Sequence, residues 1–172
     1  MYRHYTKLML VVGITCLLGA CGFQLRGTGS AGAALPDAWK KMHLVTGNPN
    51  AEFSQAVRTA FATDGIEWMD RAEANYSLLL GPERFSQTNL SLNSEARVSQ
   101  LELTMQSKFS VVDRSGREVM PETVASVLVQ MENDPRNAMG KGDEIRIHKS
   151  EMRSELARQI LRRIGFFATS TP

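Results

Sequence analysis

The chain has 172 residues, of which 42% are hydrophobic and 22% charged, as is ordinary for one globular domain. Its 20 basic residues include Arg3 and Lys7, and there are 18 acidic residues. Removal of the first 20 residues would leave 18 of each sign and a net charge of about zero. This balance argues against a general nucleic-acid binder, which carries a basic excess. Cys16 and Cys21 are the only cysteines, too few for a disulfide framework or a cysteine-based metal site.

The N-terminus has the pattern of a signal peptide. Arg3 and Lys7 precede an apolar run at 8–20, which is shorter than the roughly 20 residues that span a bilayer. The run ends in Gly19-Ala20-Cys21, small residues before a cysteine, and resembles the lipobox of bacterial lipoproteins. We expect Cys21 to carry a diacylglycerol and an N-acyl chain, such as palmitate. The alternative is an ordinary secretion signal with an incidental cysteine.

These features predict the organisation of the chain. Residues 1–20 form the signal peptide, and 21–36 form the lipidated N-terminus and a Gly-, Ala- and Ser-rich tether. Residues 37–168 form the folded domain, and 169–172 form a short tail. Gly22, which is not an aspartate, resembles an outer-membrane address, so we expect a lipid anchor on the periplasmic side of that membrane.

The first half of the domain predicts one helix among short strands. A strand at 42–45 leads to a turn at 47–50, where Asn50 is the expected cap of a helix at 51–63. The helix has one apolar face and stops at Asp64-Gly65. A short apolar segment at 66–69 follows, and then strands at 76–80 and 85–92. The expected apolar face consists of Phe53, Ala56, Val57, Ala60 and Phe61.

The clearest strand is 101–111, in which apolar and polar residues alternate and only Ser107 interrupts the apolar row. A hairpin turn at 113–116 and a valine-rich strand at 123–131 follow it. One dry and one wet face are typical of antiparallel sheets. The expected buried row consists of Leu101, Leu103, Met105, Phe109 and Val111.

The last expected helix is 136–164, with basic residues in its final turn and Gly140 and Gly142 weakening its first turns. We therefore predict an α+β fold, in which two amphipathic helices pack on one face of a mostly antiparallel four-stranded sheet, in the order strand, helix, strands, helix. The apolar stripe of this helix consists of Ile145, Met152, Leu156, Ile160, Leu161 and Ile164.

Residues for catalysis do not gather in any known pattern. His43 and His148 lie far apart in the sequence without acids at ligand spacing, and there is no phosphate loop or nucleophile elbow. We therefore expect a protein that is not an enzyme and that uses no cofactor and no metal.

The wet face of strand 101–111 is polar and largely uncharged, so it could meet another surface through hydrogen bonds, or it could simply face solvent. Arg97, Lys108, Arg136 and Lys141 are candidate anion-binding residues. The alternative for each of them is an ordinary solvated surface charge.

Four motifs occur in order along the mature chain. They are Cys21-Gly22-Phe23-Gln24-Leu25-Arg26-Gly27; Gly47-Asn48-Pro49-Asn50 followed by Phe53-Ser54-Gln55-Ala56-Val57-Arg58; Gly65-Ile66-Glu67-Trp68-Met69-Asp70; and Asn133-Asp134-Pro135 with Ala138-Met139-Gly140-Lys141. Together with the lipobox they resemble the LptE family of lipopolysaccharide-assembly lipoproteins.

The resemblance implies a subunit that plugs the outer-membrane barrel LptD, assists its assembly and binds lipopolysaccharide on its way to the outer leaflet. Lys141 lies inside a matched motif, so the resemblance implies that it binds lipopolysaccharide, with Arg97 and Arg136 as further candidates. The implied partners are LptD, lipopolysaccharide and the inner leaflet of the outer membrane, and nucleic acid is not among them. Two alternatives are an accessory lipoprotein of general barrel assembly, acting only through protein contacts, and a lipid-anchored enzyme.

Overall fold

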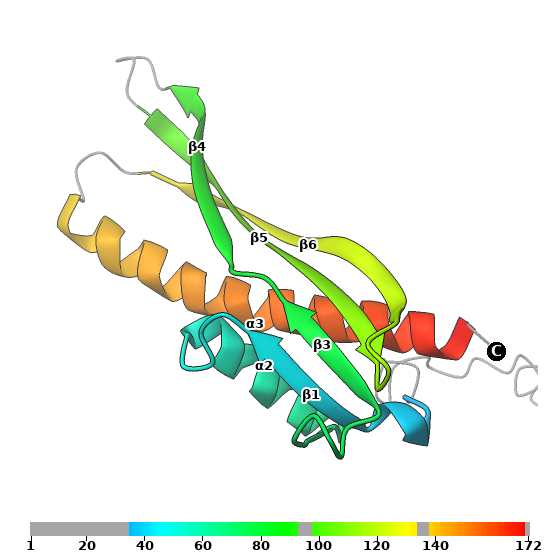
Figure 1. Ribbon diagram of the computed structural model, residues 1–172. Coiled ribbons are helices and arrows are strands. Elements are labelled where there is room, and N and C mark those ends of the chain that lie inside the picture. Colours follow the sequence, from blue (N-terminus) through cyan, green and yellow to red (C-terminus); the bar gives the residue numbers. More distant parts are fainter. Residues whose placement is uncertain (1–34, 93–97, 134–137, 171–172) are drawn as a thin grey trace, which may run out of the picture. The chain divides into compact units, whose positions relative to one another are not determined.

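The computed structural model describes residues 35–92, 98–133 and 138–170, all within one of the two units of the chain, Gly32–Pro172. Helices α2 and α3 lie on the same side of one sheet (Figure 1). The predicted α+β class is confirmed. In chain order the elements are η1 (Asp37–Trp39), β1 (Lys41–Thr46), α2 (Glu52–Thr63), β2 (Glu67–Trp68), β3 (Tyr76–Leu80), β4 (Arg84–Leu92), β5 (Val98–Asp113), β6 (Glu118–Glu132) and α3 (Ala138–Ser170).

The sheet has six strands and is mixed, so the prediction of a mostly antiparallel four-stranded sheet is wrong. The order is β2-β1-β3-β5-β4, and β6 pairs with β5. β1 runs parallel to both β2 and β3, whereas β5 is antiparallel to β3, β4 and β6. The parallel pairing of β1 and β2 arises because α2 connects them. The helix carries the chain back along the sheet, so that β2 starts beside the start of β1 and runs in the same direction.

β5 organises the sheet because three strands pair with it. β3 pairs with its C-terminal part and β4 with its N-terminal part, while β6 follows nearly its whole length. The predicted alternation is confirmed: the row from Leu101 to Val111, with Ser107 in it, is buried, and Gln106 and Lys108 are exposed. The buried row faces the helices and forms the centre of the core.

The helices supply the other half of the core. The predicted face of α2 is confirmed, with Phe53, Val57 and Phe61 buried. α3 packs on α2, β5 and β6 through the predicted stripe from Met152 to Ile164. It also covers part of the free edge of β6, because the Gln159 side chain accepts a hydrogen bond from the backbone N–H of Ser126 at 3.1 Å.

Several expected helix ends are wrong. Asn50 does not cap α2: its N–H donates to the Asn48 side chain at 3.1 Å, and the capping residue is Ala51. α3 contains Gly140 and Gly142, as expected, but it continues past the predicted end at Ile164 to Ser170, so its last turn holds no basic residue. Packing against the sheet overrides the weak helix propensity of the glycines and extends the helix past Ile164.

The two predicted turns with glycine have the expected geometry. Gly65 ends α2 with a φ of 85°, and Gly116 closes the β5–β6 hairpin with a φ of 84°. Glycine occupies this left-handed region without a steric penalty. Across the described ranges, no helix combines the length and the hydropathy needed to cross a bilayer.

Candidate functional site

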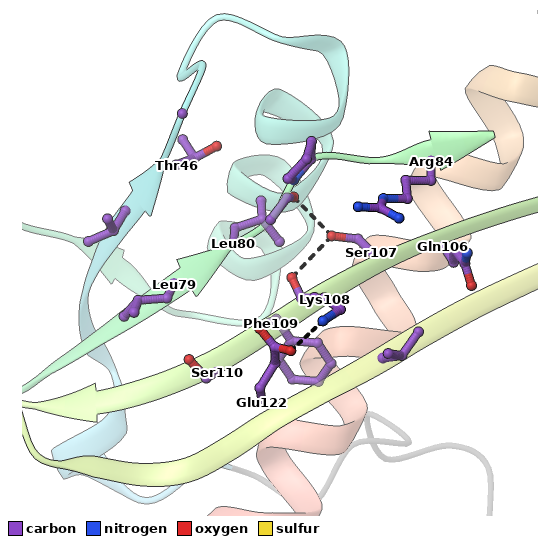
Figure 2. A pocket seen from close by; sticks show the side chains of 15 residues that line it. Thr46, Leu79, Leu80, Arg84, Gln106, Ser107, Lys108, Phe109, Ser110 and Glu122 are labelled. Atoms are coloured by element: carbon purple, nitrogen blue, oxygen red, sulfur yellow. Dashed lines mark hydrogen bonds and ion pairs between the residues drawn. The ribbon is translucent and has the colours of Figure 1, made fainter.

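The face of the sheet turned away from the helices has a hollow of about 460 Å³ (Figure 2). It lies where β1, β3, β5 and β6 meet the start of β4, and it combines polar and apolar side chains. Its lining includes Val45, Thr46, Leu79, Pro82, Arg84, Gln106, Lys108, Ser110, Glu122 and Val124.

The hollow forms where β3 ends and β4 begins, opposite the middle of β5. The N–H of Gly81 donates to the carbonyl of Lys108 at 2.8 Å, and the Ser107 hydroxyl donates to the carbonyl of Gly81 at 2.9 Å. A Cβ at position 81 would lie 3.0 Å from the Lys108 carbonyl oxygen. Glycine therefore allows this close approach, and Ser107 interrupts the apolar row because its hydroxyl satisfies a carbonyl at the break.

The charges around the hollow are exposed. Lys108 Nζ lies 2.6 Å from Glu122 Oε1, with both side chains about three-fifths exposed, at 58% and 60%. Such a pair contributes only about 0–1 kcal/mol to stability because water screens it. Arg84 forms no ion pair with any of the residues that the structure describes. Both cations are therefore accessible to an anionic group.

Apolar side chains border the polar row of β5 on the same face. Val45, Val124 and Leu128 are 39%, 45% and 53% exposed, and β6 places the last two opposite Lys108 and Thr104 of β5. This part of the surface is not among the sites predicted from the sequence. A signal was available: Val127, Leu128 and Val129 are consecutive apolar residues, a pattern that puts apolar groups on both faces of a strand.

Lys141 lies on the first turns of α3, at the far end of the domain from the hairpin turn at Gly116. The register places the start of β5 beside the end of β6, with Gln100 opposite Glu132, and α3 begins shortly after β6. Lys141 is half-buried and makes no ion pair within the described part of the chain. Next to it, a Cβ at Gly142 would meet nothing within 4 Å, so the backbone there is open.

The other predicted site residues, Cys21, Arg97 and Arg136, lie outside the described residues. The strands that flank Arg97 are described: β4 ends at Leu92 and β5 starts at Val98. The end of β4 and the start of β5 form one end of the sheet. Figure 1 shows the first turns of α3 at this same end.

An ion-pair cluster attaches α3 to the connection between β3 and β4. Arg153 Nε lies 2.8 Å and Nη2 2.7 Å from the Glu83 carboxylate, and Nη1 contacts Glu52 at the start of α2. The hydrogen bonds to Glu83 raise the pKa of Arg153, against the smaller opposing effect of burial. Side-chain exposures of 17% for Arg153 and 25% for Glu83 mean that water screens this pair less than Lys108 and Glu122.

The two histidines of the domain lie on different elements and have different partners. Nδ1 of His43 donates to the Met69 carbonyl at 2.9 Å, and Nδ1 of His148 lies 3.3 Å from the Glu151 carboxylate on α3. No group of three or more potential metal ligands occurs among the residues described.

Solved structures of bacterial lipoproteins share this fold. Rare lipoprotein B from Shewanella oneidensis has a TM-score of 0.64 at 23% identity, over 72% of this chain and 92% of that one. Lipoprotein B from Nitrosomonas europaea has a TM-score of 0.68 at 16% identity, over 87% and 94%. At these identities the likeness shows a shared fold.

The family follows from the sequence match. Residues 39–164 match the family model LptE, described as lipopolysaccharide-assembly, and the chain belongs to this family. The LPS-assembly lipoprotein LptE of Yersinia pestis (strain Pestoides F) is 25% identical over 162 residues, which cover 91% of this chain and 74% of that protein. The resemblance predicted from the four motifs is confirmed.

Proposed function

We propose that this protein is the outer-membrane lipoprotein subunit of a lipopolysaccharide translocon, and that it does no chemistry of its own. It plugs the lumen of an LptD-type barrel, assists the assembly of that barrel, and binds lipopolysaccharide for insertion in the outer leaflet. The observation that carries the proposal is the family match. It spans residues 39–164 and therefore every described helix and strand except the start of η1 and the end of α3.

We assign contact with the barrel to the open face of the sheet. Protein interfaces combine apolar contacts with hydrogen-bonding groups, and this face presents Val45, Val124 and Leu128 beside the polar row of β5. A barrel wall is itself lined by polar side chains, which suits a plug whose surface is only partly apolar. The hollow lets a side chain of the partner enter the surface beside Lys108 and Arg84.

We assign lipopolysaccharide binding to Lys141, Arg97 and Arg136. The lipid A head carries phosphates, so its recognition requires accessible cations beside a surface that tolerates acyl chains. Lys141 supports this assignment because it has an open backbone next to it and no carboxylate partner in the described residues. One exposed contact contributes about 0–1 kcal/mol, so several charges must act together.

We further propose that Cys21 carries a diacylglycerol and an N-acyl chain, and that these lipids hold the protein on the periplasmic side of the outer membrane. Residues 1–20 are then removed, and the segment that starts at Cys21 joins the anchor to the domain, in which Leu35 is already buried. Replacing Cys21→Ala should abolish metabolic labelling with a radioactive fatty acid, while the unchanged chain is labelled. Equal labelling of the two proteins would refute the anchor.

Co-purification tests the barrel role directly. A tagged full-length chain should retain LptD from solubilised outer membranes, and Leu128→Asp with Val124→Asp should reduce that recovery at equal protein level. Ile147→Asp is the matched control, since Ile147 is 52% exposed but lies on α3. Recovery of the general barrel-assembly machinery in place of LptD would instead support the accessory-lipoprotein function.

Lipopolysaccharide capture tests the binding role separately. The double variant Lys141→Asp with Arg97→Asp should capture less lipopolysaccharide, and added salt should weaken capture by the unchanged protein, because screening weakens exposed charges. Circular dichroism checks that the fold is unchanged, and recovery of LptD should persist. Unchanged capture by the folded variant would remove these residues from the site and leave the barrel role standing.

A further inference from the structure

The C-terminal end of α3 exposes an aromatic side chain that the barrel and lipopolysaccharide assignments do not use. Phe166 is 74% exposed, more than any other large hydrophobic residue that the structure describes as exposed. Beside it is an open hollow of about 470 Å³, lined by Met120, Phe167 and Ser170 among others. An exposed aromatic group next to further apolar surface is typical of an interaction site.

The charges on this part of α3 are predominantly positive. From position 155 to 170, α3 carries Arg158, Arg162 and Arg163 but only one acid, Glu155. Arg158 and Arg162 share Glu155, each with an Nη2–carboxylate distance of 2.8 Å. Arg163 donates to the Val124 carbonyl at 2.6 Å and has no carboxylate partner in the described ranges. The four residues together carry two net positive charges.

The same end of the domain receives the chain from the N-terminus. The Trp39 ring packs edge-on against Phe167, with 6.2 Å between the ring centroids, and Leu35 is buried in the same core cluster. Figure 1 shows η1 and the last turns of α3 together at one end, opposite the free ends of β4 and β5. Leu35 lies only 14 positions after Cys21, and a chain of that length spans at most about 50 Å.

We propose that Phe166, Arg162 and Arg163 form a contact site for an anionic phospholipid surface, on the leaflet that holds the acyl chains of Cys21. The inference rests on the proposed lipid anchor. Aromatic rings partition into the bilayer interface, and guanidinium groups pair with lipid phosphates. The site is small, but the tether gives it a high effective concentration at the membrane, so weak contacts are enough to hold it there.

The charge pattern selects this occupant over a second copy of the chain. Two copies that met through this patch would bring four net positive charges together, which opposes association. An anionic lipid surface instead neutralises them. Contact here would place η1 and the end of α3 beside the leaflet that holds the anchor.

A fluorescent probe in the full-length lipoprotein tests the proposal. Ser170→Cys places a thiol in the hollow and leaves Phe166 intact; a polarity-sensitive dye on this thiol reports the local environment. The protein is reconstituted into vesicles of phosphatidylethanolamine and phosphatidylglycerol that contain lipid spin-labelled at the headgroup. Leu128→Cys, at an exposed position on β6, carries the same dye as the reference site.

We expect strong quenching of the dye at position 170 and little at position 128, with less quenching when phosphatidylcholine replaces phosphatidylglycerol. Adding Phe166→Ser should weaken the contact about tenfold, as the loss of one buried aromatic side chain implies. Ile147→Ser, which removes another exposed apolar residue from the same helix, should leave quenching unchanged.

Equal quenching at the two dye positions, or no effect of Phe166→Ser, would overturn the proposal. The proposal would also be overturned if the dye at position 170 changed its environment only when LptD was added. The patch would then belong to a protein interface. Two measurements on the chain without an added cysteine report separately on the anchor. The first is flotation with the vesicles, and the second is labelling by the thiol-reactive dye, which a lipidated Cys21 does not take up. A protein that fails to float would overturn the anchor and this inference with it, whereas a floating protein with an unquenched dye overturns this inference alone.

Discussion

The two faces of the long β5–β6 hairpin differ in what covers them. On the inner face, Leu101, Leu103 and Met105 are at most 1% exposed because α3 lies over them. On the outer face, Val124 and Leu128 are about half exposed, and the polar side chains of β5 lie between them and β4. The inner face therefore supplies the free energy of folding, and the outer face is available for a partner.

Two leucines on neighbouring strands provide the largest test of this difference. Leu103→Ala should lower the free energy of unfolding by about 2–5 kcal/mol, because it removes a fully buried side chain and leaves a cavity. Leu128→Ala, at a position 53% exposed, should change it by less than about 0.5 kcal/mol. Urea denaturation of both variants measures the two values. Similar losses would mean that both faces are packed.

Two ion pairs provide the second test. Arg153→Gln should cost about 1.5–3 kcal/mol, since it leaves the partly buried carboxylate of Glu83 without its charged partner. Glu122→Gln, in the exposed pair with Lys108, should cost about 0–1 kcal/mol and have less effect in added salt. Urea midpoints at low and high salt give both numbers. A larger loss for Glu122→Gln would contradict the assignment of the outer face to solvent and partners.

The smallest expected effect depends on pH and concerns α3. The Arg162 hydrogen bond and then Arg158 lower the pKa of Glu155 below its ordinary value of 4.5, with burial opposing them. A carboxyl group whose pKa is lowered in the folded state stabilises the protein at a pH above its ordinary pKa. That stabilisation is lost as the pH falls through the folded-state pKa. The unchanged protein should therefore be slightly more stable than Glu155→Gln at pH 7, and the difference should disappear in acid. Thermal unfolding at both pH values measures it; a difference that grew in acid would contradict the assignment.

Much of the fold could be predicted from local patterns. The alternation in β5, the apolar faces of α2 and α3, and the two turns with Gly65 and Gly116 depend on neighbours in the sequence, so the sequence predicts them. The ends of the helices and strands were harder to predict. α3 extends six residues past Ile164, and β6 begins five residues before Thr123. These extensions depend on packing against other elements.

For the candidate site, the sequence could predict only the polar row of β5 and single cations. Lys141 and Lys108 were both named, but nothing in the sequence indicated that Lys108 would border a hollow with Arg84 and Glu122. That arrangement requires the register between β5 and β6 and the break at Gly81, both of which join residues far apart in the chain.

The sequence by itself determined the family, the signal for a lipid anchor and the division of β5 into a dry and a wet face. Each of these depends on residue types at short spacing. Only the tertiary structure decided that β1 pairs in parallel with β2 and β3, that Val45, Val124 and Leu128 share one open face, and that Phe166 lies at the end where the chain enters the domain. These are long-range pairings, and they are set by how α2 and α3 cover the sheet, because only a complete core determines which apolar residues remain outside it.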